Sequence, residues 1–123
     1  RRKRMEKFLN ETEAKAKWKK EALQTGWFDK VFYIETEETE EGFPDVIAVQ
    51  CEEGGCNNTA FFEFKVTDKR DRIKFQRSQP VWYIQNKILT PTIVVWHNRL
   101  QKFIYLPSVI AVEQINDRLE IQL

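Results

Sequence analysis

The stretch Gly42–Val66, which reads GFPDVIAVQCEEGGCNNTAFFEFKV, decides the fold of this chain. Its apolar run Val46–Gln50 predicts a buried strand that begins directly after a Pro-Asp turn. The segment Glu52–Gly55 has the composition of a hairpin turn, so the apolar segment Ala60–Val66 is expected to return beside the first strand. The sequence therefore predicts a hairpin of two neighbouring strands.

The segment before this hairpin predicts a helix followed by a strand. Residues 5–25 contain no Gly or Pro and are rich in Glu, Lys and Ala, which favours a helix that Gly26 terminates. The helix face expected to point inward holds three apolar residues spaced seven apart and one acid: Leu9, Ala16, Leu23 and Glu13. Trp27–Ile34 then predicts a strand, and the acidic segment Glu35–Glu41 predicts an exposed loop.

The segment after the hairpin predicts a second helix and a second strand pair. A basic, polar connection, Thr67–Arg77, leads to a helix expected over Gln79–Leu89, with Ser78 as its N-cap. Beyond it we expect a strand, a surface turn with the single histidine, another strand and a tail that fits either a helix or a strand: Thr92–Trp96, His97–Arg99, Lys102–Leu106 and 107–123. This order, α-β-β-β-α-β-β, is typical of an α/β fold with helices flanking one mixed β-sheet.

Length and composition favour one domain over residues 1–123, with 1–4 as a flexible basic arm and 107–123 as a C-terminal extension. The chain is 13% aromatic, which excludes full disorder. No apolar run reaches the roughly 18 residues of a membrane span, and no apolar segment follows the basic N-terminus. We therefore expect no membrane partner and a cytoplasmic location, in a bacterial or phage-infected cell. Cys51 and Cys56 are expected to be thiols there, with a cross-strand disulfide or half of a zinc site as alternatives.

The net charge of +1 hides a strong segregation of charge along the chain. Residues 1–20 carry nine Lys and Arg against three Glu, residues 35–53 carry eight acids and no base, and residues 65–77 carry six Lys and Arg against two Asp. Two basic segments around an acidic one could line a phosphate-binding groove with an acidic centre, or be ordinary solvated faces.

Two acids and one lysine interrupt the otherwise apolar hairpin strands. Asp45 opens the first strand, while Glu63 and Lys65 share one face of the second because they are two residues apart. If the strands pair, the two carboxylates converge, and their repulsion favours a cation between them. Such oxygen ligands suit Mg²⁺ or Mn²⁺, and a metal-activated water beside a lysine can hydrolyse a phosphodiester. The alternative is a buried ion pair of Lys65 with Glu63 or Asp45 that serves structure alone.

A family resemblance rests on these residues. Gly42–Asp45 (GFPD), with Glu63–Lys65 (EFK) beginning eighteen residues after the Asp, resembles the PD-(D/E)XK nuclease motif. Gln79 and Trp82, on the following helix, resemble the Q-x-x-W feature of small phage-type members in the virus-type replication-repair (VRR-Nuc) group. That group is related in fold to archaeal Holliday-junction resolvases. The resemblance covers roughly Glu13–Leu106 and implies a restriction-endonuclease-like core.

The resemblance also implies roles for the motif residues. Asp45 and Glu63 would bind the divalent metal, Mg²⁺ or Mn²⁺, and the main-chain carbonyl of Phe64 would complete the protein ligands. Lys65 would position the attacking water and stabilise charge near the scissile phosphate. These are the roles of a metal-dependent endodeoxyribonuclease.

Two further site positions remain open between neighbours in the sequence. An acid from the first helix often joins sites of this family, and Glu13 is expected here because of its inward face, with Glu11 as the alternative. Gln79 would hold the water or the phosphate, with Gln76 as its rival, because Pro80 leaves the start of that helix uncertain.

DNA is the expected partner. The resemblance is compatible with a branched or flapped substrate and with a homodimer. Basic residues between the E-x-K strand and the second helix are expected to contact nucleic acid: Lys69, Arg70, Arg72, Lys74 and Arg77. Lysines of the first helix could add phosphate contacts: Lys15, Lys17, Lys19 and Lys20. The alternatives are a non-catalytic nucleic-acid-binding relative and a protein-interaction module.

Overall fold

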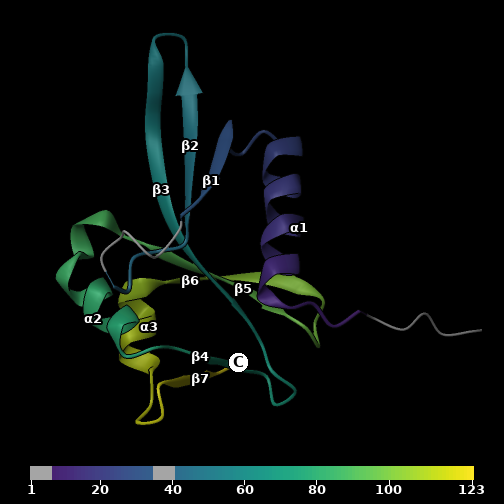
Figure 1. Ribbon diagram of the computed structural model, residues 1–123, viewed down its shortest axis with the longest axis vertical. Coiled ribbons are helices and arrows are strands. Elements are labelled where there is room, and N and C mark those ends of the chain that lie inside the picture. Colours follow the sequence, from purple (N-terminus) through teal and green to yellow (C-terminus); the bar gives the residue numbers. More distant parts are fainter. Residues whose placement is uncertain (1–6, 35–40) are drawn as a thin grey trace, which may run out of the picture.

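The chain folds around a five-stranded mixed sheet with helices on both of its faces (Figure 1). The computed structural model describes residues 7–34 and 41–123, without the side chain of Cys56. In chain order the elements are α1 (Glu11–Gln24), β1 (Lys30–Tyr33), β2 (Val46–Glu52), β3 (Gly55–Val66), β4 (Arg72–Lys74), α2 (Ser78–Gln85), η1 (Lys87–Leu89), β5 (Thr92–His97), β6 (Lys102–Pro107), α3 (Ser108–Gln114) and β7 (Glu120–Gln122).

The predicted hairpin is confirmed as the pair β2–β3. The sheet has the order β1-β2-β3-β5-β6, in which β3 and β5 run parallel and the other neighbours run antiparallel. The long hairpin extends beyond the rest of the sheet in Figure 1. Because α2 lies in the connection between the parallel strands β3 and β5, the chain has the mixed α/β architecture that its sequence predicts.

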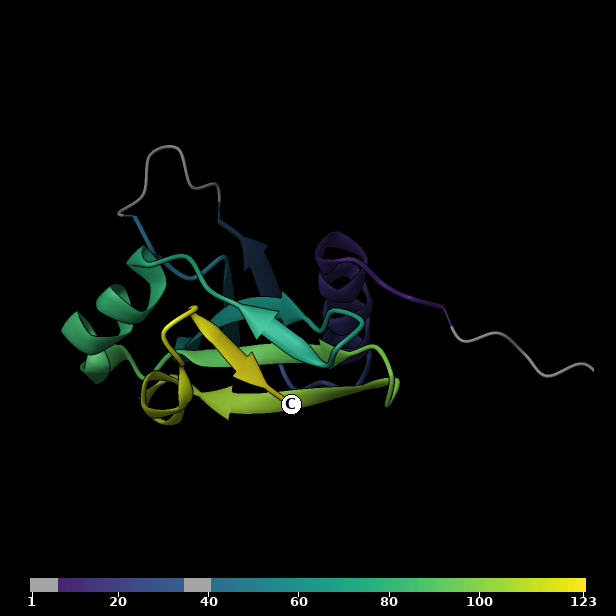
Figure 2. The same ribbon diagram turned by 90° about the horizontal axis from the view of Figure 1, so that it is seen from below.

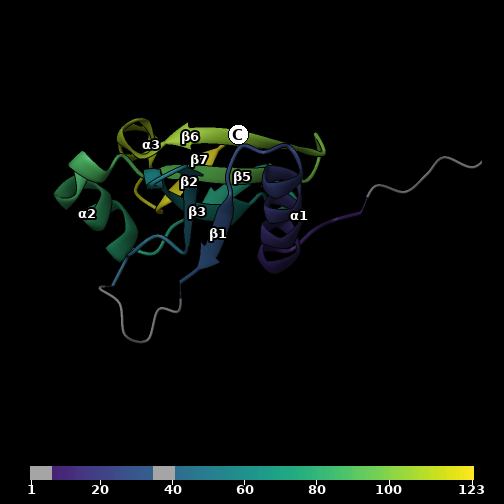
Figure 3. The same ribbon diagram turned by 90° about the horizontal axis from the view of Figure 1, so that it is seen from above.

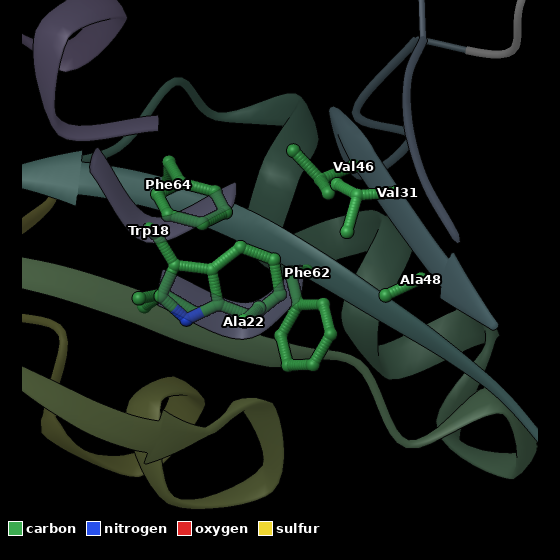
Figure 4. Close-up of a cluster of buried hydrophobic side chains, with 8 residues drawn as sticks. Trp18, Ala22, Val31, Val46, Ala48, Phe62 and Phe64 are labelled. Carbon is green, nitrogen blue, oxygen red and sulfur yellow. The ribbon is translucent and has the colours of Figure 1, made fainter. Parts of the chain in front are cut away.

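One hydrophobic core lies between α1 and the sheet. Figure 4 shows the indole of Trp18 beside the rings of Phe62 and Phe64, whose centroids lie 5.0 and 5.3 Å away. Small residues, Ala22 on the helix and Ala48 on β2, leave room for these large rings. The aromatic contacts fix α1 against β3, which is the strand that contains Glu63.

A second core lies on the opposite face of the sheet. There α2, α3 and a separate two-stranded sheet, β4–β7, lie against the five-stranded sheet (Figure 2). Ile93 and Val95 of β5 are buried in this core. Ile73 of β4 pairs with Ile121 of β7, and both are buried. The view from above in Figure 3 also separates α1 from α2. The elements β4, α3 and β7 were not among the seven predicted elements. Of these, α3 and β7 show that the tail is a helix followed by a strand.

The predicted inward face of the first helix is wrong. Three residues spaced four apart are buried instead, Ala14, Trp18 and Ala22, while Leu23 is 39% exposed. The helix begins only at Glu11, so Leu9 lies before it. The aromatic partners of Trp18 set the rotation of the helix, and they come from strands distant in the sequence.

Other boundaries also differ from the predictions. The first strand begins at Lys30, because the helix end still binds the amides of Trp27 and Phe28 through the carbonyl of Ala22. Gly26 has the positive φ of a helix stop, as predicted. The second helix begins at Ser78, which is therefore not its N-cap, and ends at Gln85.

The turn predicted at His97–Arg99 begins one residue later and spans 98–101, and the expectation of a surface histidine is wrong. His97 is the last residue of β5 and is fully buried. Its Nδ1 accepts a hydrogen bond from the amide of Leu100, 3.2 Å away. Trp27, at the start of the predicted strand, is 54% exposed, and Cys51 is disulfide-bonded where a thiol was expected.

Two predicted features lie outside the described residues: the basic arm at residues 1–4 and nearly all of the acidic loop 35–41. No helix in the described segments has both the length and the apolar character needed to cross a bilayer.

Candidate functional site

Three carboxylates from separate parts of the sequence meet at one place. Glu11 begins α1, Asp45 directly precedes β2, and Glu63 lies within β3. One carboxylate oxygen of each residue lies within 4.8 Å of the others. We call these three residues the acidic cluster. The predicted convergence of Asp45 and Glu63 is therefore present in the structure.

The hairpin and a glycine position Asp45. Val46 pairs with Phe62, which places Asp45 at the level of Glu63, and Asp45 Oδ1 accepts the amide N–H of Phe64 at 3.1 Å. Gly42, three residues earlier, has a φ of +86° and packs so closely against α2 that an added Cβ would lie 2.3 Å from the carbonyl oxygen of Ser78. Only glycine fits this approach, which holds the Pro-Asp turn against the start of α2.

A buried asparagine positions Glu11. Asn98 binds both the amide and the carbonyl of Leu9, at 2.8 and 3.2 Å. The Asn98 side chain also accepts a hydrogen bond from the indole of Trp96 and donates one to the carbonyl of Thr67. The backbone amide of Asn98 donates to the Thr67 hydroxyl. These bonds tie the chain just before α1 to the end of β3, so Glu11 is brought to the strand that contains Glu63.

The three carboxylates of the acidic cluster lie close enough to repel one another. Glu63 is only 4% exposed, and its carboxylate makes no hydrogen bond or ion pair with any residue in the described part of the chain. Burial, and then the nearby Asp45 carboxylate, raise the pKa of Glu63 well above its ordinary value. The same two causes raise the pKa of Glu11. An additional cation in the cluster would relieve this repulsion.

Lys65 is held by an amide rather than by a carboxylate. Its Nζ donates to Gln79 Oε1 at 2.8 Å and lies 5.0 Å from the centre of the Phe75 ring. Burial lowers the pKa of Lys65. Within the described residues no ion pair joins Lys65 to Glu63 or Asp45, so the predicted structural alternative is not what the structure contains.

Gln79, rather than Gln76, is the glutamine that reaches the lysine. Its Oε1 accepts from Lys65 and also from the backbone amide of Gln76, 2.9 Å away. Pro80 is accommodated in the first turn of α2, so Gln79 is in the helix.

The structure adds a second lysine to the site. Lys15 Nζ lies 2.6 Å from Asp45 Oδ2 and 3.5 Å from Glu11 Oε1. Burial acts to lower the pKa of Lys15, but Asp45, Glu11 and Glu63 together raise it. The sequence placed Lys15 only among four lysines that could contact phosphate, and it did not predict this ion pair.

Glu13 is not brought to the site, which corrects its predicted place. Its carboxylate accepts the amide of Asn10 at 3.1 Å, and Asn10 in turn accepts the amide of Glu13, forming a capping box. Glu13 also pairs with Lys7 at 2.8 Å, on the outside of the helix. An Asn followed three residues later by Glu is a helix-start signal, and applying it would have favoured Glu11.

The five basic residues predicted to contact nucleic acid lie in different parts of the structure. Arg77 directly precedes α2, two residues before Gln79, and makes no side-chain capping hydrogen bond. Arg72 pairs with Asp68 at 3.2 Å and with Glu120 at 3.6 Å, and Lys74 lies 4.0 Å from Glu120. Lys69 and Arg70 are exposed in the turn before β4. Phe64, the predicted source of a carbonyl ligand, lies between the two hairpin residues of the motif with its ring fully buried.

No protein-family model matches the chain, and neither does any curated protein sequence.

Proposed function

We propose that this chain is a divalent-metal-dependent nuclease that hydrolyses DNA phosphodiester bonds, with a PD-(D/E)XK site on a restriction-endonuclease-like core. The observation that supports it best is the acidic cluster beside a half-buried lysine that is oriented by an amide. The proposal accounts for all four residues of the motif, Asp45, Glu63, Lys65 and Gln79, with one chemical role each.

The acidic cluster fits a divalent cation. It offers carboxylate oxygens from three residues, which are the donors that Mg²⁺ and Mn²⁺ prefer. The buried Glu63 carboxylate has no partner among the described residues, and a buried charge of this kind is costly unless it is paired or binds a metal. Asp45 and Glu63 would hold the ion, with Glu11 and the carbonyl of Phe64 as further donors.

The residues of the chain would divide the work of hydrolysis. When bound, a divalent ion supplies Lewis-acid polarisation of the phosphoryl group and a lowered pKa of water. Lys65 would donate from its Nζ to a phosphate oxygen and offset the charge that develops there. Gln79 would hold that ammonium in place, as it does through the 2.8 Å hydrogen bond. Each role uses an atom that is already positioned by the fold.

The topology supports the proposed core. A helix that begins with an acid of the cluster, a strand opened by Pro-Asp, a hairpin return with E-x-K and a following Gln helix occur in this order. The DNA backbone would approach past Arg77, which adjoins Gln79, and a junction or flap substrate and a dimer remain part of the proposal. The proposed location is the cytoplasm, where DNA is accessible.

A cleavage assay tests this function. Wild type and Lys65→Met are incubated with labelled linear duplex, single-stranded, flap and four-way-junction DNA in Mg²⁺, Mn²⁺ or EDTA. Lys102→Met is the matched control, because Lys102 is an exposed lysine on β6 outside the site. The proposal expects cleavage by wild type and the control, loss with Lys65→Met, and none in EDTA.

The alternatives give different results in the same experiment. Salt-sensitive DNA binding by folded protein without cleavage in either metal would replace the nuclease with a non-catalytic binding relative. Neither binding nor cleavage would favour a protein-interaction module.

A further inference from the structure

Lys15 lies where a cation is needed. Its Nζ contacts Asp45 Oδ2 and Glu11 Oε1, two of the three carboxylates in the acidic cluster. The side chain is 21% exposed, so the ammonium lies near the surface of the cluster. In the metal-free protein, Lys15 therefore supplies part of the positive charge that the cluster lacks.

Both carboxylate oxygens of Asp45 are already in contact with a donor. Oδ1 of Asp45 is taken by the amide of Phe64, and Oδ2 is taken by Lys15. A divalent cation that binds Asp45 at the cluster meets the ammonium at the same carboxylate, and the two positive charges repel each other at such short distances. Glu63 differs, because its carboxylate has no partner among the described residues and requires no displacement.

The position of Lys15 on α1 would allow its ammonium a second role after displacement from Asp45. Glu11, Lys15 and Lys19 are spaced four apart, so they follow one face of α1. Lys19 lies with its Nζ 5.0 Å from the ring centre of the half-exposed Tyr33, at the edge strand β1. The lysine stem is flexible and α1 holds its base, so an ammonium released from Asp45 stays close to the cluster.

We propose that Lys15 is an internal counter-ion that a divalent metal displaces from Asp45, and that the freed ammonium then binds a phosphate oxygen of the DNA. This inference rests on the proposed function. It assigns α1 a part in coupling metal binding to DNA binding, and it makes Lys15 a positioning residue in the metal-free state and a DNA contact in the metal-bound state.

The first test measures metal affinity without DNA. Mn²⁺ binding to wild type, Lys15→Met and Lys15→Arg is followed by electron paramagnetic resonance of the free ion. Lys17→Met is the matched control, since Lys17 is on the same helix but pairs with Glu21, 3.2 Å away. Asp45→Asn defines which binding belongs to the cluster.

The inference expects Lys15→Met to bind Mn²⁺ about tenfold more tightly than wild type, because the competing charge is gone. Lys15→Arg and Lys17→Met should show no such gain. Each variant is first checked for cooperative thermal unfolding. If Lys15→Met does not fold, Lys15→Arg still tests the inference. That variant keeps a positive charge beside Asp45, so it should bind Mn²⁺ no more tightly than wild type.

The second test measures DNA affinity in Ca²⁺, which binds oxygen ligands. Lys15→Met is expected to weaken binding several-fold relative to Lys102→Met, which removes an exposed lysine on β6 outside the site. Equal or weaker Asp45-dependent Mn²⁺ binding by Lys15→Met would overturn the inference and leave the nuclease proposal intact. Tighter Mn²⁺ binding by Lys15→Arg than by wild type would also overturn it. An absence of Asp45-dependent Mn²⁺ binding in every variant would overturn the metal site itself, and the inference with it.

Discussion

The Nζ of Lys65 donates a hydrogen bond to the side-chain oxygen of Gln79, 2.8 Å away, and this bond joins β3 to the first turn of α2. The lysine is thereby kept off the carboxylates of its own strand. Its ammonium is half-buried and has a fixed direction, which is what a group that must meet a developing charge requires.

Replacing Gln79 tests the value of this orientation. Gln79→Ala should lower the cleavage rate about 10- to 100-fold, the usual cost of losing a residue that orients a metal-site group. Gln85→Ala, an exposed glutamine on the same helix, is the control and should cleave at the wild-type rate. Rates are measured at saturating Mg²⁺, with circular dichroism to check the fold. An unchanged rate in Gln79→Ala would remove Gln79 from the site.

Glu63 makes a prediction about stability and pH in the metal-free protein. Burial, and then Asp45, raise the pKa of Glu63 above its ordinary value of 4.5, so the folded state binds this proton more tightly than the unfolded chain does. The associated stability is present below the unfolded pKa and is lost as the pH rises through the folded pKa. Glu63→Gln, which resembles the protonated acid, should therefore increase the free energy of unfolding in EDTA at about pH 8 by about 1–3 kcal/mol.

Urea unfolding of wild type and Glu63→Gln at several pH values checks this. The difference between the two proteins should grow as the pH rises from about 4 to about 8. The control is Glu113→Gln, an exposed acid on α3. A variant that is less stable than wild type at the higher pH would mean that the Glu63 carboxylate is already well paired.

The two acids at the start of α1 predict opposite outcomes. Glu13→Gln loses the charge of a capping box and of the Lys7 contact, so it should cost at most about 1 kcal/mol of stability and leave cleavage unchanged. Glu11→Gln removes an acid of the cluster, so it should weaken metal binding and cleavage about 10- to 100-fold. Thermal unfolding and Mg²⁺ titrations of the cleavage rate measure both. The reverse pattern would restore Glu13 as the acid of the site.

The hairpin and its motif could be predicted because they depend on residues near one another in the sequence. Asp45 opens a continuous apolar strand, and Glu63 and Lys65 lie on the strand that returns after the turn. The exact register could not be predicted, because it shifts by one residue between Gln50 and Cys51. The nearness of Gln79 to Lys65 could likewise be expected from the sequence, because the second helix follows the strand after a short connection.

The remaining features depend on partners far apart in the sequence. The rotation of α1 follows from Trp18 packing on Phe62 and Phe64, and it brought Glu11 and Lys15 to the cluster in place of Glu13. The strand β4 exists because residues 72–74 pair with residues 120–122, and a polar connection gives no local sign of such a partner. These long-range contacts decide which α1 residues join the site.

The central claim is that Asp45 and Glu63 hold a divalent cation, and anomalous diffraction from a crystal grown with Mn²⁺ tests it most directly. The account predicts an anomalous peak bounded by carboxylate oxygens of Asp45 and Glu63, with Lys65 still on Gln79. A map without a peak at the cluster, with Glu63 bound instead to a protein donor, would contradict it.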